Sequence, residues 1–162
     1  MIVVSDTSPL LNLARIGRLE LLPSLYHQVI VPAAVYEELT ASKSDLPRAI
    51  DLDSMPWLKV ATASDRRQVQ ELREYLDAGE AEAIILAIER GADLLLVDER
   101  RARRAATARG ITVTGLLGVV AQAKRAGLID LAKPVLDELI HMARFWIGSE
   151  LYTEVLTELG EA

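Results

Sequence analysis

The chain has 162 residues, of which 51% are hydrophobic and 26% are charged, and its formal net charge is −6. This length is enough for one domain with a substantial core, and the composition excludes global disorder. The absence of cysteine excludes disulfides, thiolate zinc sites and cysteine nucleophiles. The negative charge argues against a protein that coats DNA regardless of sequence, because such proteins are usually basic.

Short apolar runs alternate with helical patterns along the first half of the chain. In chain order we expect a strand at 2–5, helices at 9–16 and 19–25, a strand at 27–31, a helix from 32 to 39, a loop at 42–56 and a strand at 57–61. Thr7 or Ser8 can cap the first helix, with Pro9 in its first turn, and Gly17 ends it. Pro32 is expected to open the third helix.

The second half of the chain is richer in helical patterns. We expect helices at 64–75 and 80–90, a strand at 94–97, a basic helix at 99–109, a strand at 111–114, and helices at 116–126, 130–143 and 149–159. Ser64 and Asp77 are cap candidates, and Gly91 and Gly110 end two of the helices. This order predicts an α/β fold with a parallel sheet covered by helices on both faces. We expect a single domain over 1–162, with a core at 1–115 and a helical C-terminal part at 116–162.

No apolar stretch is long and uninterrupted enough to span a bilayer. The N-terminus also lacks a basic region before a long apolar segment, so a secretory signal is not expected. We therefore expect a soluble cytoplasmic protein with no membrane partner.

Acidic residues follow the ends of two predicted strands. Asp6 comes directly after the first strand and Asp98 directly after the strand at 94–97. In an open parallel sheet, ligands bind beyond the carboxyl ends of the strands. Glu38, two turns into a helix, and Glu80, at the start of another, can both point toward that edge. Four such carboxylates resemble a cage for Mg²⁺ or Mn²⁺, which prefer oxygen ligands.

Each of these residues also has a purely structural interpretation. Asp6 or Asp98 can cap the helix that follows it, and Glu38 can be a solvated helix residue. Glu80 and Glu82 are both favourable near a helix start because of the helix dipole. These two glutamates stand at i and i+2 and face different ways, so we expect one of them to point toward the site. The residues alone leave open which one.

Clustered carboxylates suggest a specific chemistry. They repel one another, and at least one tends to be protonated unless a cation is bound. A divalent metal relieves that repulsion, lowers the pKa of a bound water and stabilises charge on a phosphorane-like transition state. The expected reaction is in-line attack of water on a phosphodiester, which requires neither a histidine nor a cysteine nucleophile.

Several segments, in this order and spacing, resemble the PIN-domain family: VVSDTSPLLNLA, VPAAVYEEL, LDAGEAEAIILA, LLLVDERRARRAA and GITVTGLLGVVAQAKRAGLI. More narrowly, they resemble VapC-like PIN proteins with a GEAEA motif and a helical C-terminal extension. The resemblance covers nearly the whole chain, including the tail FWIGSELYTEVLTELGE. It implies a PIN-like three-layer α/β/α fold with a central parallel sheet of four to five strands. It also implies a metal-dependent endoribonuclease that uses Mg²⁺ or Mn²⁺.

Carried over residue by residue, the resemblance gives catalytic and metal-binding roles to Asp6, Glu38, Glu80 and Asp98. Thr7 or Ser8 matches a hydroxyl that supports the metal ligands. Glu80 stands where many PIN domains have Asp, and its extra methylene leaves open whether it would bind metal directly or through water. Glu82 remains a rival to Glu80 for this role.

Arginines cluster immediately after Asp98. Arg100, Arg103 and Arg104 share one face of the predicted helix. One interpretation is a solvated amphipathic helix, and another is a face that binds RNA phosphates without contacting bases. A third is that a cognate antitoxin inserts acidic groups there.

Other protein classes fit less well. A phosphohydrolase that forms an aspartyl-phosphate usually opens with DxD, but Ser8 stands two residues after Asp6. A receiver domain has an acidic pair near its first strand, which is absent here. The alternative that stays open is a catalytically weak PIN fold that binds nucleic acid or protein, although all four acidic positions are filled.

The last three predicted helices are each apolar on one face. We expect most of these side chains to pack in the core, and some to form a homodimer interface, because PIN domains commonly dimerise. The resemblance implies RNA as substrate and a toxin role with a cognate antitoxin in a VapBC-type pair. The sequence does not specify the RNA target.

Overall fold

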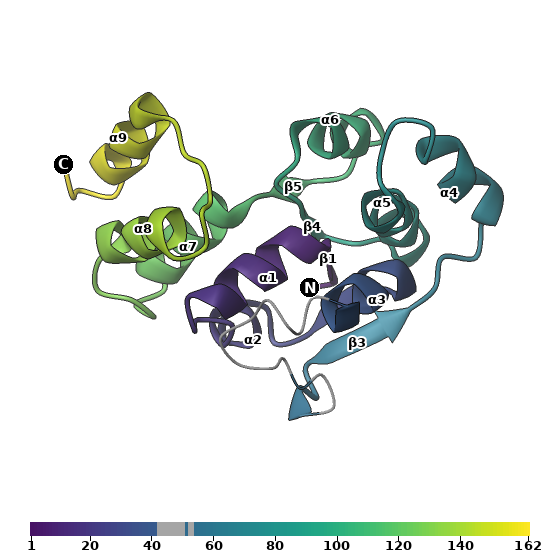
Figure 1. The fold of residues 1–162 in the computed structure, drawn as a ribbon, viewed down its shortest axis with the longest axis horizontal. Coiled ribbons are helices and arrows are strands. Elements are labelled where there is room, and N and C mark those ends of the chain that lie inside the picture. Colours follow the sequence, from purple (N-terminus) through teal and green to yellow (C-terminus); the bar gives the residue numbers. More distant parts are fainter. Residues whose placement is uncertain (42–50, 52–53) are drawn as a thin grey trace.

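A five-stranded parallel sheet lies at the centre of the computed structural model, which describes residues 1–41, 51 and 54–162 (Figure 1). The strands are β1 (Val3–Ser5), β2 (Val29–Pro32), β3 (Leu58–Ala61), β4 (Leu94–Leu96) and β5 (Val113–Thr114). Their order across the sheet is β3-β2-β1-β4-β5, and every neighbouring pair is parallel. The predicted α/β fold with a central parallel sheet of four to five strands is confirmed.

Helices connect and follow these strands. Within the described residues they are α1 (Thr7–Arg15), α2 (Leu21–Tyr26), α3 (Ala33–Ala41), α4 (Arg66–Leu72), α5 (Ala78–Arg90), α6 (Arg100–Ala108), α7 (Leu116–Arg125), α8 (Ala132–His141) and α9 (Ser149–Glu158). Figure 1 shows α7, α8 and α9 gathered at one end of the molecule, with α4 and α5 toward the other. Among the described helices, none is both long enough and apolar enough to cross a membrane.

Side chains of the central strands alternate between two cores. Val3 and Leu96 belong to a core built with α1, α2, α3, α7 and α8, whereas Val4 and Leu95 belong to a core built with α4, α5 and α6. Because successive side chains of a strand point to opposite faces, a strand covered on both faces is apolar at every position. This double burial explains the uninterrupted apolar runs in the sequence and produces three layers.

The pairing of β1 with β4 fixes where the site lies. Val3 is paired with Leu94 and Ser5 with Leu96, so the two strands end side by side. The N–H of Asp6 then donates to the carbonyl of Leu96 at 2.9 Å. The residues that follow the two strands therefore leave the sheet at the same edge.

The starts of two helices depend on choices that the sequence left open or gave differently. Of the three cap candidates Asp6, Thr7 and Ser8, Asp6 occupies the N-cap position of α1. Pro32 is the last residue of β2, and α3 begins one residue later. Proline is compatible with both positions, because its missing N–H is tolerated at the end of a strand as well as in the first turn of a helix. The sequence therefore did not determine which of the two elements contains Pro32.

The helix α4 is shorter than the predicted span 64–75. Its cap is Asp65 rather than Ser64, because the Asp65 side chain accepts a hydrogen bond from the N–H of Gln68. The loop predicted at 42–56 falls largely on residues 42–50 and 52–53, which lie outside the described residues. The strong signals at the ends of α5 are confirmed: Asp77 caps it, and Gly91 ends it in the left-handed conformation at φ 58°.

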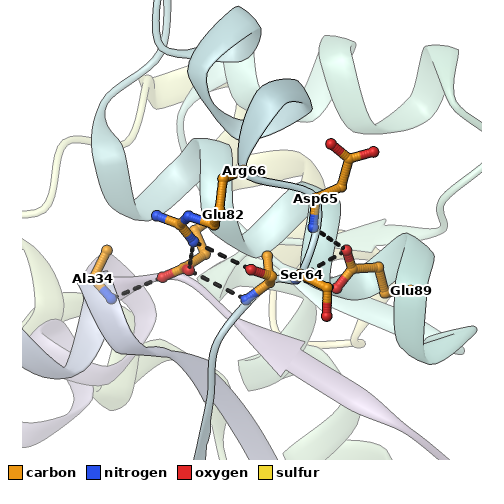
Figure 2. Close-up of polar contacts among 7 residues, drawn as sticks. Ala34, Ser64, Asp65, Arg66, Glu82 and Glu89 are labelled. Carbon is orange, nitrogen blue, oxygen red and sulfur yellow. Dashed lines mark hydrogen bonds and ion pairs between the residues drawn. The ribbon is translucent and has the colours of Figure 1, made fainter.

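Buried Glu82 ties three segments together (Figure 2). Its side chain sits on α5 and is 1% exposed. Its Oε1 accepts from the N–H of Ala34 at 2.9 Å, and its Oε2 accepts from the N–H of Ala63 at 3.2 Å and forms an ion pair with Arg66. Glu82 thus joins α5 to the start of α3 and to the segment before α4.

Glu89, about two helical turns further along α5, makes a similar contact at the surface (Figure 2). Its carboxylate accepts from the N–H groups of Ser64 at 2.7 Å and Asp65 at 2.9 Å. The two glutamates therefore bind adjacent backbone segments in opposite environments, one buried and one exposed.

We expect Glu82→Ala to lower the free energy of unfolding by about 3 kcal/mol, because it leaves the N–H groups of Ala34 and Ala63 without an acceptor. The matched control Glu89→Ala should cost about 1 kcal/mol, because water can replace the lost acceptor at the surface. Urea unfolding followed by circular dichroism measures both values. Equal losses in the two variants would show that the burial of Glu82 has no energetic importance.

Candidate active site

An acidic cavity of about 610 Å³ opens at the carboxyl edge of the sheet. All four predicted carboxylates line it: Asp6, Glu38, Glu80 and Asp98. They come from the end of β1, from α3, from the first turn of α5 and from the residues after β4. The structure therefore brings together side chains that are up to 92 positions apart in the sequence.

Asp6 is deeply buried, with 5% of its surface exposed. It stands at the N-cap position of α1, yet its side chain makes no capping hydrogen bond. Burial raises the pKa of Asp6 to about 8; the backbone N–H of Thr7 opposes this rise, and the charges of Asp77, Glu80 and Glu38 add to it. A carboxylate in this position is costly to ionise unless a cation is close.

Two hydroxyls at the start of α1 hold carboxylates on either side of Asp6. Thr7 Oγ1 donates to Glu38 Oε2 at 2.7 Å, and Ser8 Oγ donates to Asp98 Oδ2 at 3.3 Å. Both predicted hydroxyls thus contact a predicted carboxylate. A single strand–helix junction orients acidic groups that belong to two other elements.

Asp98 is held from a helix that begins 18 residues later in the chain. Its Oδ1 accepts from the N–H of Leu116, the first residue of α7, at 2.8 Å. Burial raises the pKa of Asp98, while the bonds from Leu116 and Ser8 and the charge of Arg103 oppose the rise. Asp98 therefore caps α7 and not the basic helix that directly follows it.

Glu80 and Glu82 have separate environments on the same helix. Glu80 forms a capping box: its N–H donates to Asp77 Oδ1 at 2.8 Å, and its Oε1 accepts from the N–H of Asp77 at 3.0 Å. Burial raises the pKa of Glu80, the Asp77 bond opposes this, and nearby acidic charges reinforce it. Glu80 lines the acidic cavity, whereas Glu82 does not, because both of its oxygens bind the structural partners shown in Figure 2.

Two glycines leave room for the carboxylates. A Cβ at Gly79 would stand 2.8 Å from Glu38 Oε1 and 3.2 Å from Asp6 Oδ1. A Cβ at Gly115 would stand 2.7 Å from both Asp98 Oδ1 and Arg103 Nη1. Any side chain at either position would displace an acidic group, so the cavity depends on bare backbone on both sides.

The donor atoms around this cavity fit a hard divalent cation. Carboxylate and hydroxyl oxygens line it, and neither sulfur nor histidine takes part. As the side chains stand, the described residues contain no group of three or more Asp, Glu or His that could hold an ion alone. Mg²⁺ usually keeps several waters and binds through one or two carboxylates, so direct contact with three is not required. The residues present therefore fit a hydrated Mg²⁺ or Mn²⁺.

Several lining residues were not predicted from the sequence. The acidic cavity also contacts Leu11, Asn12, Arg15, Asp77, Glu99, Phe145 and Trp146. Asn12 had a usable signal: it lies four residues after Ser8, on the same helix face, and its Nδ2 donates to Ser8 Oγ at 3.1 Å. Phe145 and Trp146 had none, because the fold brings them in from the segment between α8 and α9.

A larger cavity of about 1040 Å³ adjoins the acidic one, and Asp98, Phe145 and Trp146 line both. The three arginines that were predicted to share a face all line the larger cavity: Arg100, Arg103 and Arg104. Arg125 of α7 adds a guanidinium that was not predicted. Apolar residues of α9 and its C-cap form another part of the lining, namely Leu151, Val155 and the C-cap Leu159.

In EDTA, Asp6→Asn should melt at a higher temperature than the wild type at pH 8, and the difference should vanish toward pH 4. The pKa of Asp6 rises from 3.8 to about 8 on folding, so the folded state keeps a proton that the unfolded chain releases. The stability from this group is fully present below pH 3.8 and is lost as the pH rises to about 8. Asparagine does not titrate, so Asp6→Asn does not lose this stability as the pH rises.

The exposed Asp65 provides a control of opposite sign. Its pKa is lowered by the hydrogen bonds from the side chain and backbone of Gln68, so Asp65→Asn should destabilise the protein at neutral pH and lose its effect in acid. Thermal melts between pH 4 and pH 9 measure both variants. Parallel pH curves for Asp6→Asn and wild type would contradict the assigned burial of Asp6.

Comparison with known proteins identifies the family and a solved structure of similar fold. A PilT N-terminus domain protein from the archaeon Sulfolobus solfataricus P2 has a similar structure, with a TM-score of 0.58 and 22% identity over 76% of this chain and 93% of that chain. At this identity the likeness shows the fold alone. A search of curated proteins gives no match. The family model DUF3368, described as a PIN domain, matches residues 2–161, and the chain therefore belongs to the PIN domain family.

Proposed function

We propose that this protein is a Mg²⁺- or Mn²⁺-dependent endoribonuclease that hydrolyses RNA phosphodiester bonds at the acidic cavity. PIN domains are generally nucleases, and they generally use divalent metal ions. The observation that carries the proposal is the convergence of four carboxylates from four elements around Asp6, which is buried and makes no capping bond. An arrangement this costly to ionise is typical of a site that binds a cation.

The residues of the acidic cavity have different roles in the proposed reaction. Asp6, Glu38, Glu80 and Asp98 would hold the metal, which when bound supplies an activated water and positive charge beside the phosphate. Thr7 and Ser8 hold Glu38 and Asp98 in orientation through their hydroxyl hydrogen bonds. The Thr7 and Ser8 hydroxyls therefore position ligands rather than react.

We assign the α6 arginines to the phosphates of the RNA. Arg100 and Arg104 are exposed, and all three predicted arginines line the cavity that continues from Asp98. Arg103 is less exposed, and its Nη1 donates to the carbonyl of Val97 at 3.3 Å, which holds it beside the strand end. Guanidinium groups in such positions bind phosphate oxygens and set the position of a strand without contacting bases.

The proposal extends to a cytoplasmic toxin of a VapBC-type pair, with a cognate antitoxin, and to a homodimer. Support for the toxin role is the resemblance of the sequence motifs, including GEAEA, to VapC-like proteins. Support for a homodimer is the exposure of the apolar side chain of Leu131 at the start of α8, which is 52% exposed. Light scattering should give twice the chain mass of 17.8 kDa, and a constant monomer mass at all concentrations would refute the dimer.

Asp6→Asn and Asp98→Asn should each reduce Mn²⁺-dependent RNA cleavage by about 100-fold or more, while both proteins stay folded. Asparagine keeps the shape of the side chain but removes the charge that binds the cation. Gly79→Ala provides a sharper variant, because it keeps every charge and moves only the carboxylates beside the new methyl group. It should lower cleavage by about tenfold or more through misplacement of these groups.

The matched control is Glu89→Gln, an exposed carboxylate removed from the same helix but outside the cavity, and it should cleave RNA like the wild type. Gel assays of RNA cleavage and Mn²⁺ titration by calorimetry measure the two properties separately. Full cleavage by folded Asp6→Asn would show that Asp6 only occupies the start of α1 and does not bind the metal. Absence of Mn²⁺ binding to the wild type would favour the alternative of a catalytically weak PIN fold that binds nucleic acid or protein.

A further inference from the structure

Trp146 is the most exposed large apolar side chain among the described residues, at 85%. It lies in the segment between α8 and α9 (Figure 1). Its neighbours Phe145 and Ile147 both pack against the core, so Trp146 projects outward between two inward side chains. A side chain this exposed buries little area and adds little to the stability of the fold. Its position therefore calls for an explanation other than packing.

The backbone segment that carries this indole is held in place. Arg144 adopts φ 56°, an uncommon conformation for a residue other than glycine, and the N–H of Phe145 donates to the carbonyl of Leu139 at 2.9 Å. On the other side, the indole ring lies close to Gly148, with Cη2 3.5 Å from where a Cβ would stand. An exposed ring that is positioned in advance loses little entropy when a ligand binds.

Trp146 also stands at the junction of the two cavities. Phe145 and Trp146 line both of them, together with Asp98. On one side of this junction are the carboxylates around Asp6, and on the other are exposed guanidinium groups, among them Arg104 and Arg125. A ligand that extends from the acidic cavity into the larger one would contact first a flat aromatic side chain and then positively charged groups.

We propose that Trp146 is a stacking platform for an unpaired base of the RNA, next to the phosphodiester in the acidic cavity. This inference rests on the proposed nuclease function. Aromatic side chains combined with a basic groove are the usual means of binding single strands, because every base has a face that can stack. In a duplex, by contrast, the bases are already stacked on each other, and an A-form helix exposes mainly its backbone and base edges.

Other occupants use only part of this arrangement. An acidic peptide would pair with the arginines, but it has no need of an exposed indole. A second copy of the chain would contact the arginines and Trp146, but with its net charge of −6 it offers no suitable ligand to the carboxylates of the acidic cavity. A single RNA strand uses both the phosphate-binding side chains and the ring.

The test measures RNA binding in EDTA, so that its result does not depend on cleavage. The probe is a labelled single-stranded RNA of about eight nucleotides, which suits a single-strand site of ordinary size. Two comparison probes are the same length of RNA without bases and an RNA duplex. The variants are Trp146→Ala, Trp146→Phe and, as matched control, Met142→Ala, which removes another exposed apolar side chain that lines neither cavity.

Trp146→Ala should weaken binding of the single strand by about tenfold or more, and Trp146→Phe should restore most of the affinity. Met142→Ala should bind like the wild type. The abasic strand and the duplex should bind wild type and Trp146→Ala equally, because neither offers an unpaired base. Stacking should also quench indole fluorescence in a Trp57→Phe background, where Trp146 is the remaining tryptophan.

Unchanged affinity of Trp146→Ala for the single strand would overturn the platform, even if RNA cleavage is confirmed. An equal loss for the abasic strand would also overturn it, because the ring would then not contact a base. The platform would also be overturned if Trp146→Ala converts a dimer to a monomer and its affinity for the single strand falls only because the dimer is lost. Trp146-dependent binding by a protein that cleaves no RNA would support the platform and refute the proposed function instead.

Discussion

The burial of the Asp6 carboxylate at the end of β1 is the constraint on which the rest of the site depends. A group that is 5% exposed and surrounded by other acids resists ionisation, yet it makes no capping bond that would stabilise the charge. The neighbouring hydroxyls bind the other carboxylates instead: Thr7 Oγ1 donates to Glu38, and Ser8 Oγ donates to Asp98. A local stability cost of this kind is common at functional sites, where the arrangement is maintained by activity and not by folding.

Glu80 and Glu82 show what distinguishes a structural buried acid from a candidate ligand. Both are buried and stand two residues apart on α5, so neither exposure nor sequence position separates them. Glu82 has a backbone or side-chain donor at each oxygen, whereas the only hydrogen bonds of Glu80 among the described residues are those of its capping box. The donors to Glu82 come from the start of α3, from the segment before α4 and from Arg66 at the start of α4, which lie 16 to 48 positions away in the sequence. The face of α5 that meets the sheet edge could therefore be determined only from the fold.

The sequence was sufficient where structure is determined locally. The doubly buried strands had continuous apolar runs, and α5 had a strong cap at Asp77 and a glycine stop at Gly91, so their positions could be predicted. The convergence of Asp6 and Asp98 followed from one general property of parallel sheets. The prediction was wrong where a residue suits two neighbouring elements, as Pro32 does, since the choice depends on tertiary packing. It was incomplete where the partner is remote, as with Asp98 and Leu116.

The C-terminal helices are part of the candidate site and not an addition to it. The first N–H of α7 holds Asp98, and the end of the chain is tied back to the start of α8, where Glu161 accepts from the N–H groups of Ala132 at 2.8 Å and Lys133 at 2.9 Å. Glu161 also pairs with Lys124 of α7 at 2.7 Å. These bonds fix α9, whose apolar residues line the larger cavity together with the arginines of α6. A chain that ended at residue 115 would keep the four carboxylates but lose the donor to Asp98, the α9 part of the cavity and Trp146. The division into a core at 1–115 and a helical part at 116–162 therefore describes the order of elements along the chain, while the site spans both.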